Sequence, residues 1–241
     1  MDYLYDGTFE GLLTGVYYHY KIKKTTGIYE VLSYQQSIVN DFKTIETDIE
    51  KAEIVSSAIK EKISNEAYIY IYYCFLSNIN YKENIILDFL IFGFKYGRNT
   101  MNFFSNEKVL PIKEAYIKVS REEQKFLGIL RFADVGGILY AKFSPDNDLL
   151  ILLIDHFADR YKYEKFIIHD EKRKKAAIYA EGAYRIEDVE ISDIEYSNQE
   201  KMFQNLWKHY FTNLAIKERK NINLQFQFVP GRYRKNMTEF K

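Results

Sequence analysis

The hydrophobic periodicity of this chain changes near residue 128, and this change limits the possible folds more than any other feature of the sequence. Before it, apolar residues recur every three or four positions in segments 41–63, 82–104 and 108–127, as amphipathic helices require. After it, short β-type segments alternate with glycine-containing turns. The sequence therefore predicts an α+β fold in which a helical block packs with an antiparallel sheet.

The expected sheet follows the order ββαβββ, with a helix on one face. Its strands are expected at 128–135, 138–144, 165–169, 174–180 and 183–189, with the helix at 149–160. Nearer the start of the chain, residues 3–5 and 28–34 resemble strands, and Thr8 resembles the N-cap of a helix between them. Segment 67–76 is rich in Tyr, Ile and Phe, but its neighbours favour a helix, and we interpret it as one. A last helix at 199–216 precedes an irregular basic segment.

The sequence shows no internal repeat, Pro-rich linker or low-complexity tract, and it predicts one domain over 1–241. That domain would have a helix-rich part (41–128), a sheet part (129–191) and a C-terminal helix with a basic segment (196–241). The apolar stretches are shorter than the roughly 20 residues of a membrane-spanning helix. The one cysteine, Cys74, lies in an apolar run and indicates a reducing compartment. We therefore expect a cytoplasmic protein that does not enter a membrane.

Charge is balanced over the chain but not along it. Lys plus Arg and Asp plus Glu both number 34, so no net field draws the molecule to a polyanion. Residues 201–241 nevertheless hold nine basic residues against two acidic ones, a net charge of +7 that the rest of the chain offsets. Basic residues interleaved with aromatic ones are typical of nucleic-acid surfaces. The alternative is that these charges pair with the acidic body or lie on a solvated tail.

Two of the four histidines lie beside carboxylates. His156 is close in sequence to Asp159, and His169 is followed by Asp170. A carboxylate that binds one imidazole nitrogen raises the basicity of the other, as general-base catalysis requires. The alternative is a structural histidine that caps backbone carbonyls. The spacing fits no metal motif, and the glycines at 93 and 97 lack the strand–loop–helix context of a phosphate-binding loop.

Several segments resemble, in order, a bacterial family described as DNA-metabolism or DNA-repair proteins, a domain of unknown function. The matching segments span nearly the whole chain: 5–14, 93–98, 131–132, 136–141, 156–160, 168–170, 206–208, 210–211, 216, 218–219, 221, 225, 230 and 232–233. Members of that family occur beside a radical-SAM protein thought to modify or repair DNA, or are fused to a uracil-DNA glycosylase-like domain. This chain has no three-cysteine cluster for an iron–sulfur centre, so the resemblance implies the companion and not the radical enzyme.

From the basic segment and the resemblance together, we expect an accessory protein that binds DNA and acts with such a partner, without a cofactor or metal. The candidate nucleic-acid-binding residues are Arg160, Trp207, Lys208, Arg219, Arg232, Tyr233, Arg234 and Lys235. One alternative is an enzyme that acts on a base or backbone through His156, Asp159, His169 and Asp170. Another is an interaction scaffold that never contacts nucleic acid.

Overall fold

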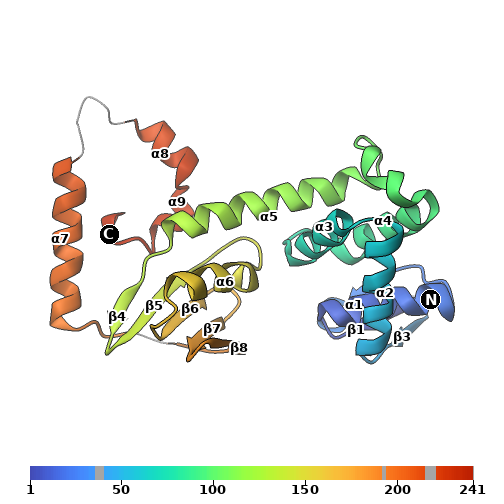
Figure 1. Ribbon diagram of the computed structural model, residues 1–241, viewed down its shortest axis with the longest axis horizontal. Helices are drawn as coiled ribbons and strands as arrows, with labels where there is room; N and C mark the ends of the chain where they lie inside the picture. Colours follow the sequence, from blue (N-terminus) through green and yellow to red (C-terminus); the bar gives the residue numbers. More distant parts are fainter. Residues whose placement is uncertain (36–40, 192–193, 215–220, 241) are drawn as a thin grey trace. The chain divides into compact units, whose positions relative to one another are not determined.

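The computed structural model describes residues 1–35, 41–191, 194–214 and 221–240 (Figure 1). The chain divides into two compact units, unit 1 (Met1–Ser120) and unit 2 (Arg121–Lys241). Both combine helices with a sheet, which confirms the α+β class. The boundary falls inside one helix, α5 (Leu110–Ile129), where no linker marks it. Because the sequence has no linker at this boundary, it predicts one domain and gives no sign of two units.

Unit 1 contains a parallel three-stranded sheet of order β2-β1-β3. The strands are β1 (Asp2–Tyr5), β2 (Ile28–Glu30) and β3 (Phe42–Thr44), and η1 (Val31–Ser33) follows β2. As predicted, Thr8 caps α1 (Phe9–Lys21), because its Oγ1 accepts a hydrogen bond from the Gly11 amide at 3.0 Å. The chain passes through α1 between β1 and β2, and such a crossover makes consecutive strands parallel.

The helix predicted over 41–63 begins later than expected. Residues 42–44 pair with β1 as β3, and α2 (Ile49–Lys62) starts only after its N-cap Asp48, whose Oδ1 accepts a hydrogen bond from the Lys51 amide at 3.0 Å. Pairing with an existing strand outweighs the local helical pattern there, because the strand supplies backbone partners from another part of the chain.

The remaining helices of unit 1 are α3 (Asn65–Leu76), α4 (Lys82–Tyr96) and the 3₁₀ turn η2 (Gly97–Asn102). The interpretation of the aromatic segment as a helix is confirmed by α3, which Ser64 caps. The helix predicted over 82–104 instead ends at Tyr96, because Gly97 adopts a φ of +61°. These helices and the sheet enclose one core, whose fully buried members include Tyr3, Leu12, Ile28, Ile59, Ile71 and Phe89.

Unit 2 contains a five-stranded sheet of order β4-β5-β6-β7-β8. The elements follow the predicted order: β4 (Ala133–Val135), β5 (Ile138–Phe143), α6 (Leu150–Arg160), β6 (Phe166–Asp170), β7 (Lys175–Ala180) and β8 (Ala183–Asp188). The expectation of a wholly antiparallel sheet is wrong at one pairing, because β5 and β6 run parallel. The helix α6 lies between them in sequence and returns the chain to the end of the sheet at which β5 begins, so that β6 runs in the same direction as β5.

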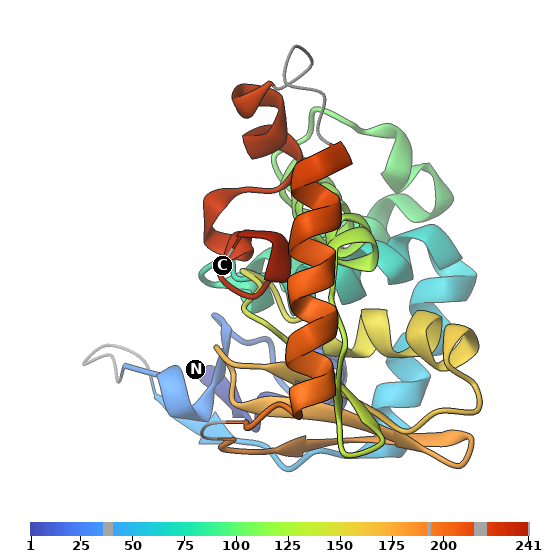
Figure 2. The same ribbon diagram turned by 90° about the vertical axis from the view of Figure 1, so that its left-hand side faces the viewer.

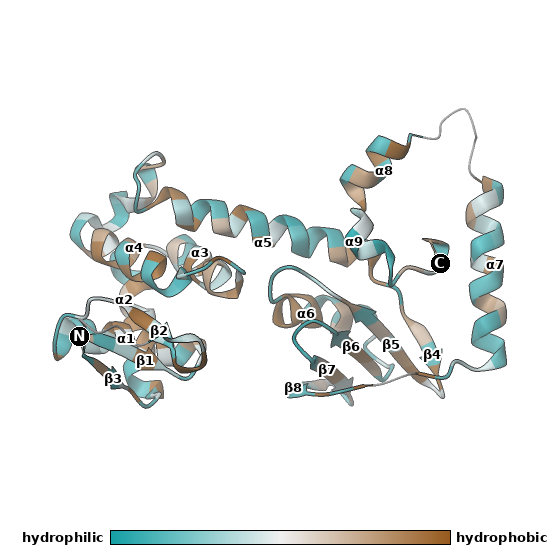
Figure 3. Ribbon diagram, turned by 180° about the vertical axis from the view of Figure 1, so that it is seen from behind, coloured by the Kyte–Doolittle hydropathy of each residue, from teal (hydrophilic) through white to brown (hydrophobic). Residues whose placement is uncertain are grey.

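The face of the sheet that carries α6 is identified by its side chains. Phe166 contacts Tyr161 at the end of α6, with ring centroids 6.2 Å apart, and Figure 3 shows the apolar residues of α6, β5 and β6. Because side chains alternate along a strand, Ile168 shares this face and His169 points to the other. Phe157 and Leu153 of α6 complete the buried layer.

The C-terminal region contains more helix than predicted. After α7 (Asn198–Leu214) come α8 (Ile222–Phe228), α9 (Gly231–Arg234) and η4 (Thr238–Phe240), so the segment expected to be irregular is largely helical in its described part. Helix α7 packs against β4 and η4, and Figure 2 shows it in front of the sheet. Among the described residues, no helix has the length and apolar character needed to cross a bilayer.

Candidate nucleic-acid interface

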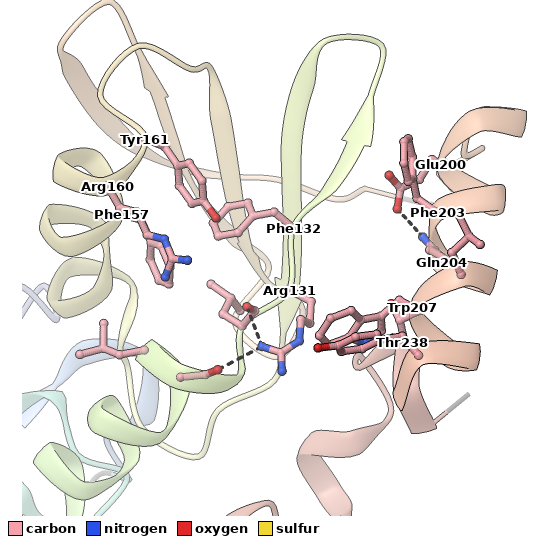
Figure 4. Close-up of a pocket in the computed structure, with 15 residues that line it drawn as sticks. Arg131, Phe132, Phe157, Arg160, Tyr161, Glu200, Phe203, Gln204, Trp207 and Thr238 are labelled. Carbon is pink, nitrogen blue, oxygen red and sulfur yellow. Dashed lines mark hydrogen bonds between the residues drawn. The ribbon is translucent and has the colours of Figure 1, made fainter. Parts of the chain in front are cut away.

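A cavity of about 850 Å³ lies within unit 2, where the end of α5, the start of β4, the end of α6 and one face of α7 meet (Figure 4). Among the described residues, six aromatic ones line it together with two arginines: Phe132, Phe157, Tyr161, Phe203, Trp207 and Tyr210, with Arg131 and Arg160. Its size is in the range of small-ligand sites, and the aromatic rings suit a planar molecule, with the exposed Arg160 as the cation that a negative group could reach.

The first wall of the cavity is held by aromatic packing around Phe132. Its ring lies 5.1 Å from the ring of Phe157 and 5.1 Å from that of Tyr161, both in edge-to-face geometry. Phe157 is buried on the inner face of α6, and it fixes Phe132 in place. Arg160, in the last turn of α6, is exposed, and its guanidinium lies 5.6 Å from the Tyr161 ring. This wall therefore offers a rigid aromatic surface with a cation at its rim.

The second wall is α7, which has no buried residue. Its apolar side chains nevertheless follow the helical spacing that normally faces a core. Trp207 stacks on Tyr210, with ring centroids 5.7 Å apart and planes 25° from parallel. Figure 4 shows Trp207 and Phe203 on the opposite side of the cavity from Arg160 and Tyr161. An aromatic face that water still reaches can accept another planar group.

Arg131 connects the two walls. Its Nη1 donates to the Gly128 carbonyl at 3.0 Å, and its Nη2 contacts Glu239 Oε1 at 3.0 Å. The Glu239 side chain is 3 % exposed, and its Oε2 also accepts a hydrogen bond from Trp207 Nε1 at 3.3 Å. One carboxylate from the C-terminal turn thus holds an arginine and the indole of α7. Among the described residues, Arg131 Nε is buried without a hydrogen-bond partner.

Two basic residues of the C-terminal segment pair with carboxylates of unit 2. Arg232 Nη2 lies 2.8 Å from Asp146 Oδ2, and Lys235 Nζ lies 3.2 Å from Glu171 Oε2. Both side chains remain more than half exposed, at 59 % and 57 %. They therefore contribute to the surface potential, but each has a carboxylate beside it.

Arg234 is packed differently. Its guanidinium lies 4.0 Å from the centroid of the Phe226 ring and 4.4 Å from that of Phe240, and its Nε donates to the Val229 carbonyl at 2.9 Å. These contacts join α8, α9 and η4 around one cation. Arg234 consequently packs between rings of α8 and η4 and stabilises the C-terminal helices.

Tyr233 is a buried structural residue. It is 5 % exposed, and its hydroxyl donates to Glu122 Oε1 at 2.6 Å and lies 3.3 Å from Asp146 Oδ2. Its ring lies 4.7 Å from that of Phe126. Burial and then the Glu122 carboxylate raise the pKa of Tyr233 above its ordinary value, so the hydroxyl stays protonated. A ring this enclosed has no face open to a base, which removes the stacking role predicted for Tyr233.

The remaining predicted nucleic-acid ligands differ in position. Arg160 and Trp207 face the same cavity, although they belong to different elements. Lys208 is half-buried on α7, and Arg219 lies outside the described residues. The sequence pattern does not indicate Arg131, Phe132 or Tyr161 as ligands. The first two are among the residues that carry the family resemblance, whereas no sequence signal distinguishes Tyr161 from the other tyrosines.

The two predicted His/Asp pairs do not share a site. His156 and Asp159 are exposed on α6, whereas His169 points away from the sheet face that carries α6. His169 is buried, with Nδ1 2.7 Å from the Tyr140 hydroxyl, and burial lowers the pKa of its imidazole. None of these side chains lines the cavity. The arrangement does not bring the two histidines together for shared acid–base catalysis.

Asp170 is part of a turn. Its Oδ1 accepts hydrogen bonds from the amides of Lys172 and Arg173 at 2.9 and 3.2 Å, and its Oδ2 pairs with Arg173 Nη1 at 2.9 Å. The carboxyl is fully buried, and this burial raises its pKa despite the arginine. These contacts shape the β6–β7 turn. Within the described part of the chain, no cluster of three or more His, Cys, Asp or Glu side chains could hold a metal.

Fold and site together define an α+β protein whose second unit carries an aromatic cavity with two arginines. Residues 80–239 match a family described as a domain of unknown function, DUF4130, and the chain belongs to this family. A comparison with curated proteins finds no match. Every described residue that lines the cavity lies inside the matched range, so the cavity belongs to the family domain.

Proposed function

We propose that this protein is an accessory factor of DNA repair or DNA metabolism that binds nucleic acid and holds an unpaired base in the cavity of unit 2. The single observation that carries the proposal is that Arg160 and Trp207, from separate elements, line one aromatic cavity with Arg131. Single-stranded nucleic acids are held by such a combination, in which bases stack on aromatic rings and cations contact the phosphates.

The chemistry of each wall supports this assignment. Trp207 and Tyr210 offer stacking faces on α7, and the exposed guanidinium of Arg160 lies at the rim, where a phosphate can reach it. Glu200 and Gln204 also line the cavity, and Gln204 Nε2 donates to Glu200 Oε1 at 2.8 Å. Amide and carboxylate groups can form hydrogen bonds with the edges of a base. The cavity can therefore bind both the phosphate and the base of one nucleotide.

The C-terminal cations have a secondary role in this proposal. Arg232 and Lys235 are exposed but paired with carboxylates, so they attract the polyanion at long range and contribute little to tight contact. The chain resembles DNA-repair proteins that occur beside a radical-SAM enzyme or are fused to a uracil-DNA glycosylase-like domain. This resemblance suggests why the cavity would bind a base. The protein would present an extruded base to such a partner enzyme.

Trp207 makes a direct test possible, because it is the only tryptophan of the chain and it lines the cavity. Stacking of a base on its indole should quench the intrinsic fluorescence when single-stranded DNA is titrated, and a duplex of the same sequence should quench it less. Loss of one stacking contact through Trp207→Leu should lower the affinity, measured by anisotropy of labelled DNA, by about 5- to 100-fold.

Arg160→Ala should weaken binding and reduce the slope of log affinity against log salt by about 0.7, as loss of one phosphate contact predicts for a single strand. Arg121→Ala removes an exposed arginine of α5 that does not line the cavity, and it serves as the matched control. Deletion of the C-terminal segment would be a poor test, because Tyr233 and Glu239 belong to the packing of unit 2. Unquenched fluorescence, together with equal affinities for the two arginine variants, would refute the proposal.

A further inference from the structure

The strand β8 forms an open edge of the five-stranded sheet. It follows β7 in the strand order, and all six of its residues are exposed. Tyr184 and Ile186 are apolar side chains on one face of this strand, and Arg185 and Glu187 lie on the other. An exposed edge strand presents unpaired backbone donors and acceptors to any strand that can align with it.

The geometry of the β7–β8 hairpin fixes which backbone groups face outward. The hairpin closes through the two-residue turn Glu181-Gly182, whose φ angles are both positive at 55° and 83°, as a type I′ turn requires. At its far end, the Val189 amide donates to the Lys174 carbonyl at 2.8 Å. Hydrogen-bonded positions alternate along an antiparallel ladder.

It follows that the backbone groups of Arg185 and Glu187 face β7, like those of Val189. Those of Tyr184, Ile186 and Asp188 face the open edge. In the described part of the chain, no hydrogen bond occupies these three outward positions.

We propose that β8 pairs with β8 of a second copy of this chain, antiparallel and centred on Ile186. In this register the outward residues face one another: Ile186 meets its own counterpart, and Tyr184 meets Asp188. The intervening pair places Arg185 of each copy opposite Glu187 of the other, at the closely spaced positions of the ladder where side chains interact most. The resulting interface has twofold symmetry, and its two strands continue the sheets of both copies.

The charge pattern favours this register over its neighbours. A shift that centres the pair on Arg185 places two arginines opposite each other, and a shift that centres it on Glu187 does the same with two glutamates. Like charges directly opposite each other destabilise a strand pair. Within the single copy, Arg185 Nε lies 2.9 Å from Glu187 Oε1, in a pair whose side chains are 69 % and 47 % exposed. Such an exposed pair can exchange partners with little loss.

A second copy fits the edge better than an unrelated strand, because β8 is complementary to itself. Arg185 of each copy meets Glu187 of the other, the outward backbone groups align, and the two Ile186 side chains contact each other. The face that carries Tyr184 and Ile186 is the face that carries α6, since Ile186 lies opposite Ala177 in the ladder and Ala177 opposite Ile168. Pairing would therefore extend an apolar layer that already exists. The strand is short, so we expect a dimer that forms at high protein concentration and dissociates on dilution.

Charge exchange in the 241-residue chain tests the proposal, with association measured by sedimentation velocity over a range of protein concentrations. The wild type should associate to a dimer as the concentration rises. Arg185→Glu and Glu187→Arg, each alone, should weaken this association by about tenfold or more, because each places two like-charged pairs in the interface. The double variant with both exchanges should regain it, and an equimolar mixture of the two single variants should form a heterodimer.

A proline variant separates loss of the edge from loss of the fold. Ile186→Pro removes an outward amide and should abolish association while the circular dichroism spectrum is retained, since proline is tolerated where a strand's N–H faces solvent. Arg185→Pro removes an inward amide and should disturb the β7–β8 hairpin itself. A monomeric wild type at all concentrations would overturn the proposal. So would dimers that persist in both single charge variants, or a double variant that fails to regain association.

Discussion

Replacing Tyr233 by phenylalanine should destabilise unit 2, because it removes one hydroxyl from a buried network. That hydroxyl donates to Glu122 Oε1, which also accepts from the Asp146 amide at 2.7 Å. The other carboxylate oxygen accepts from the amide and side chain of Asn147 at 2.9 and 2.5 Å. Tyr233 thus joins α9 to α5 and to the loop before α6 through one carboxylate.

The expected loss is about 1.5 to 2 kcal/mol, the lower part of the range for a hydrogen bond to a charged group, since Glu122 keeps three other donors. The ring and its contact with Phe126 are retained in the variant, so no cavity is created. For a unit of this size, such a loss lowers the melting temperature by roughly 5 to 10 °C.

Urea unfolding followed by the fluorescence of Trp207 measures this loss directly, because the only tryptophan lies in the same unit. Tyr163→Phe is the matched control, since Tyr163 is 92 % exposed. It should unfold at the same urea concentration as the wild type. If Tyr233→Phe unfolds at the same urea concentration as the wild type, the hydrogen bond to Glu122 does not stabilise unit 2.

Two further predictions concern other parts of the chain. Burial would raise the pKa of Glu171, but hydrogen bonds from Asn236, Lys235 and Ser144 hold it at about 2, below its ordinary 4.5. Its stabilising contribution is therefore present above pH 4.5 and is lost as the pH falls towards 2. The free energy of unfolding, measured with urea at pH 5, 4 and 3, should fall by about 1 to 2 kcal/mol less over this range in Glu171→Gln than in the wild type, and equal pH dependences would contradict this. In unit 1, Gly93→Ala should destabilise α4 by about 1 to 3 kcal/mol, because the new methyl group would lie 2.5 Å from buried Ile63 Cδ1. Gly128→Ala, where nothing lies within 4 Å, should stabilise α5 by about 0.5 kcal/mol; calorimetry that found the same sign for both would refute the packing argument.

Local signals in the sequence determined much of the secondary structure. Thr8 and Ser64 cap the helices that follow them, and the positive-φ turn at Glu181-Gly182 closes the β7–β8 hairpin within one residue of its predicted limits. The order ββαβββ and the α+β class follow from such signals. They act within a few residues of chain, so the sequence alone carries them.

Features that depend on distant parts of the chain were decided by tertiary structure. The segment 42–44 is a strand because β1 offers it a partner, although its own pattern continues that of a helix. Tyr233 is predicted to stack on a base because it lies in a basic segment. In the structure its ring is buried, and its hydroxyl donates a hydrogen bond to the Glu122 carboxylate on α5. The local charge pattern gives no indication of this carboxylate.

The candidate site shows the same division. The sequence alone determined that cations and aromatic residues gather near the C-terminus, and it selected Arg160 and Trp207. In the folded chain these two residues face one cavity with Arg131, whereas Arg232 and Lys235 lie beside carboxylates of the same unit. Local sequence cannot show this, because a side chain's surroundings depend on surfaces that the fold brings together from segments far apart in the chain.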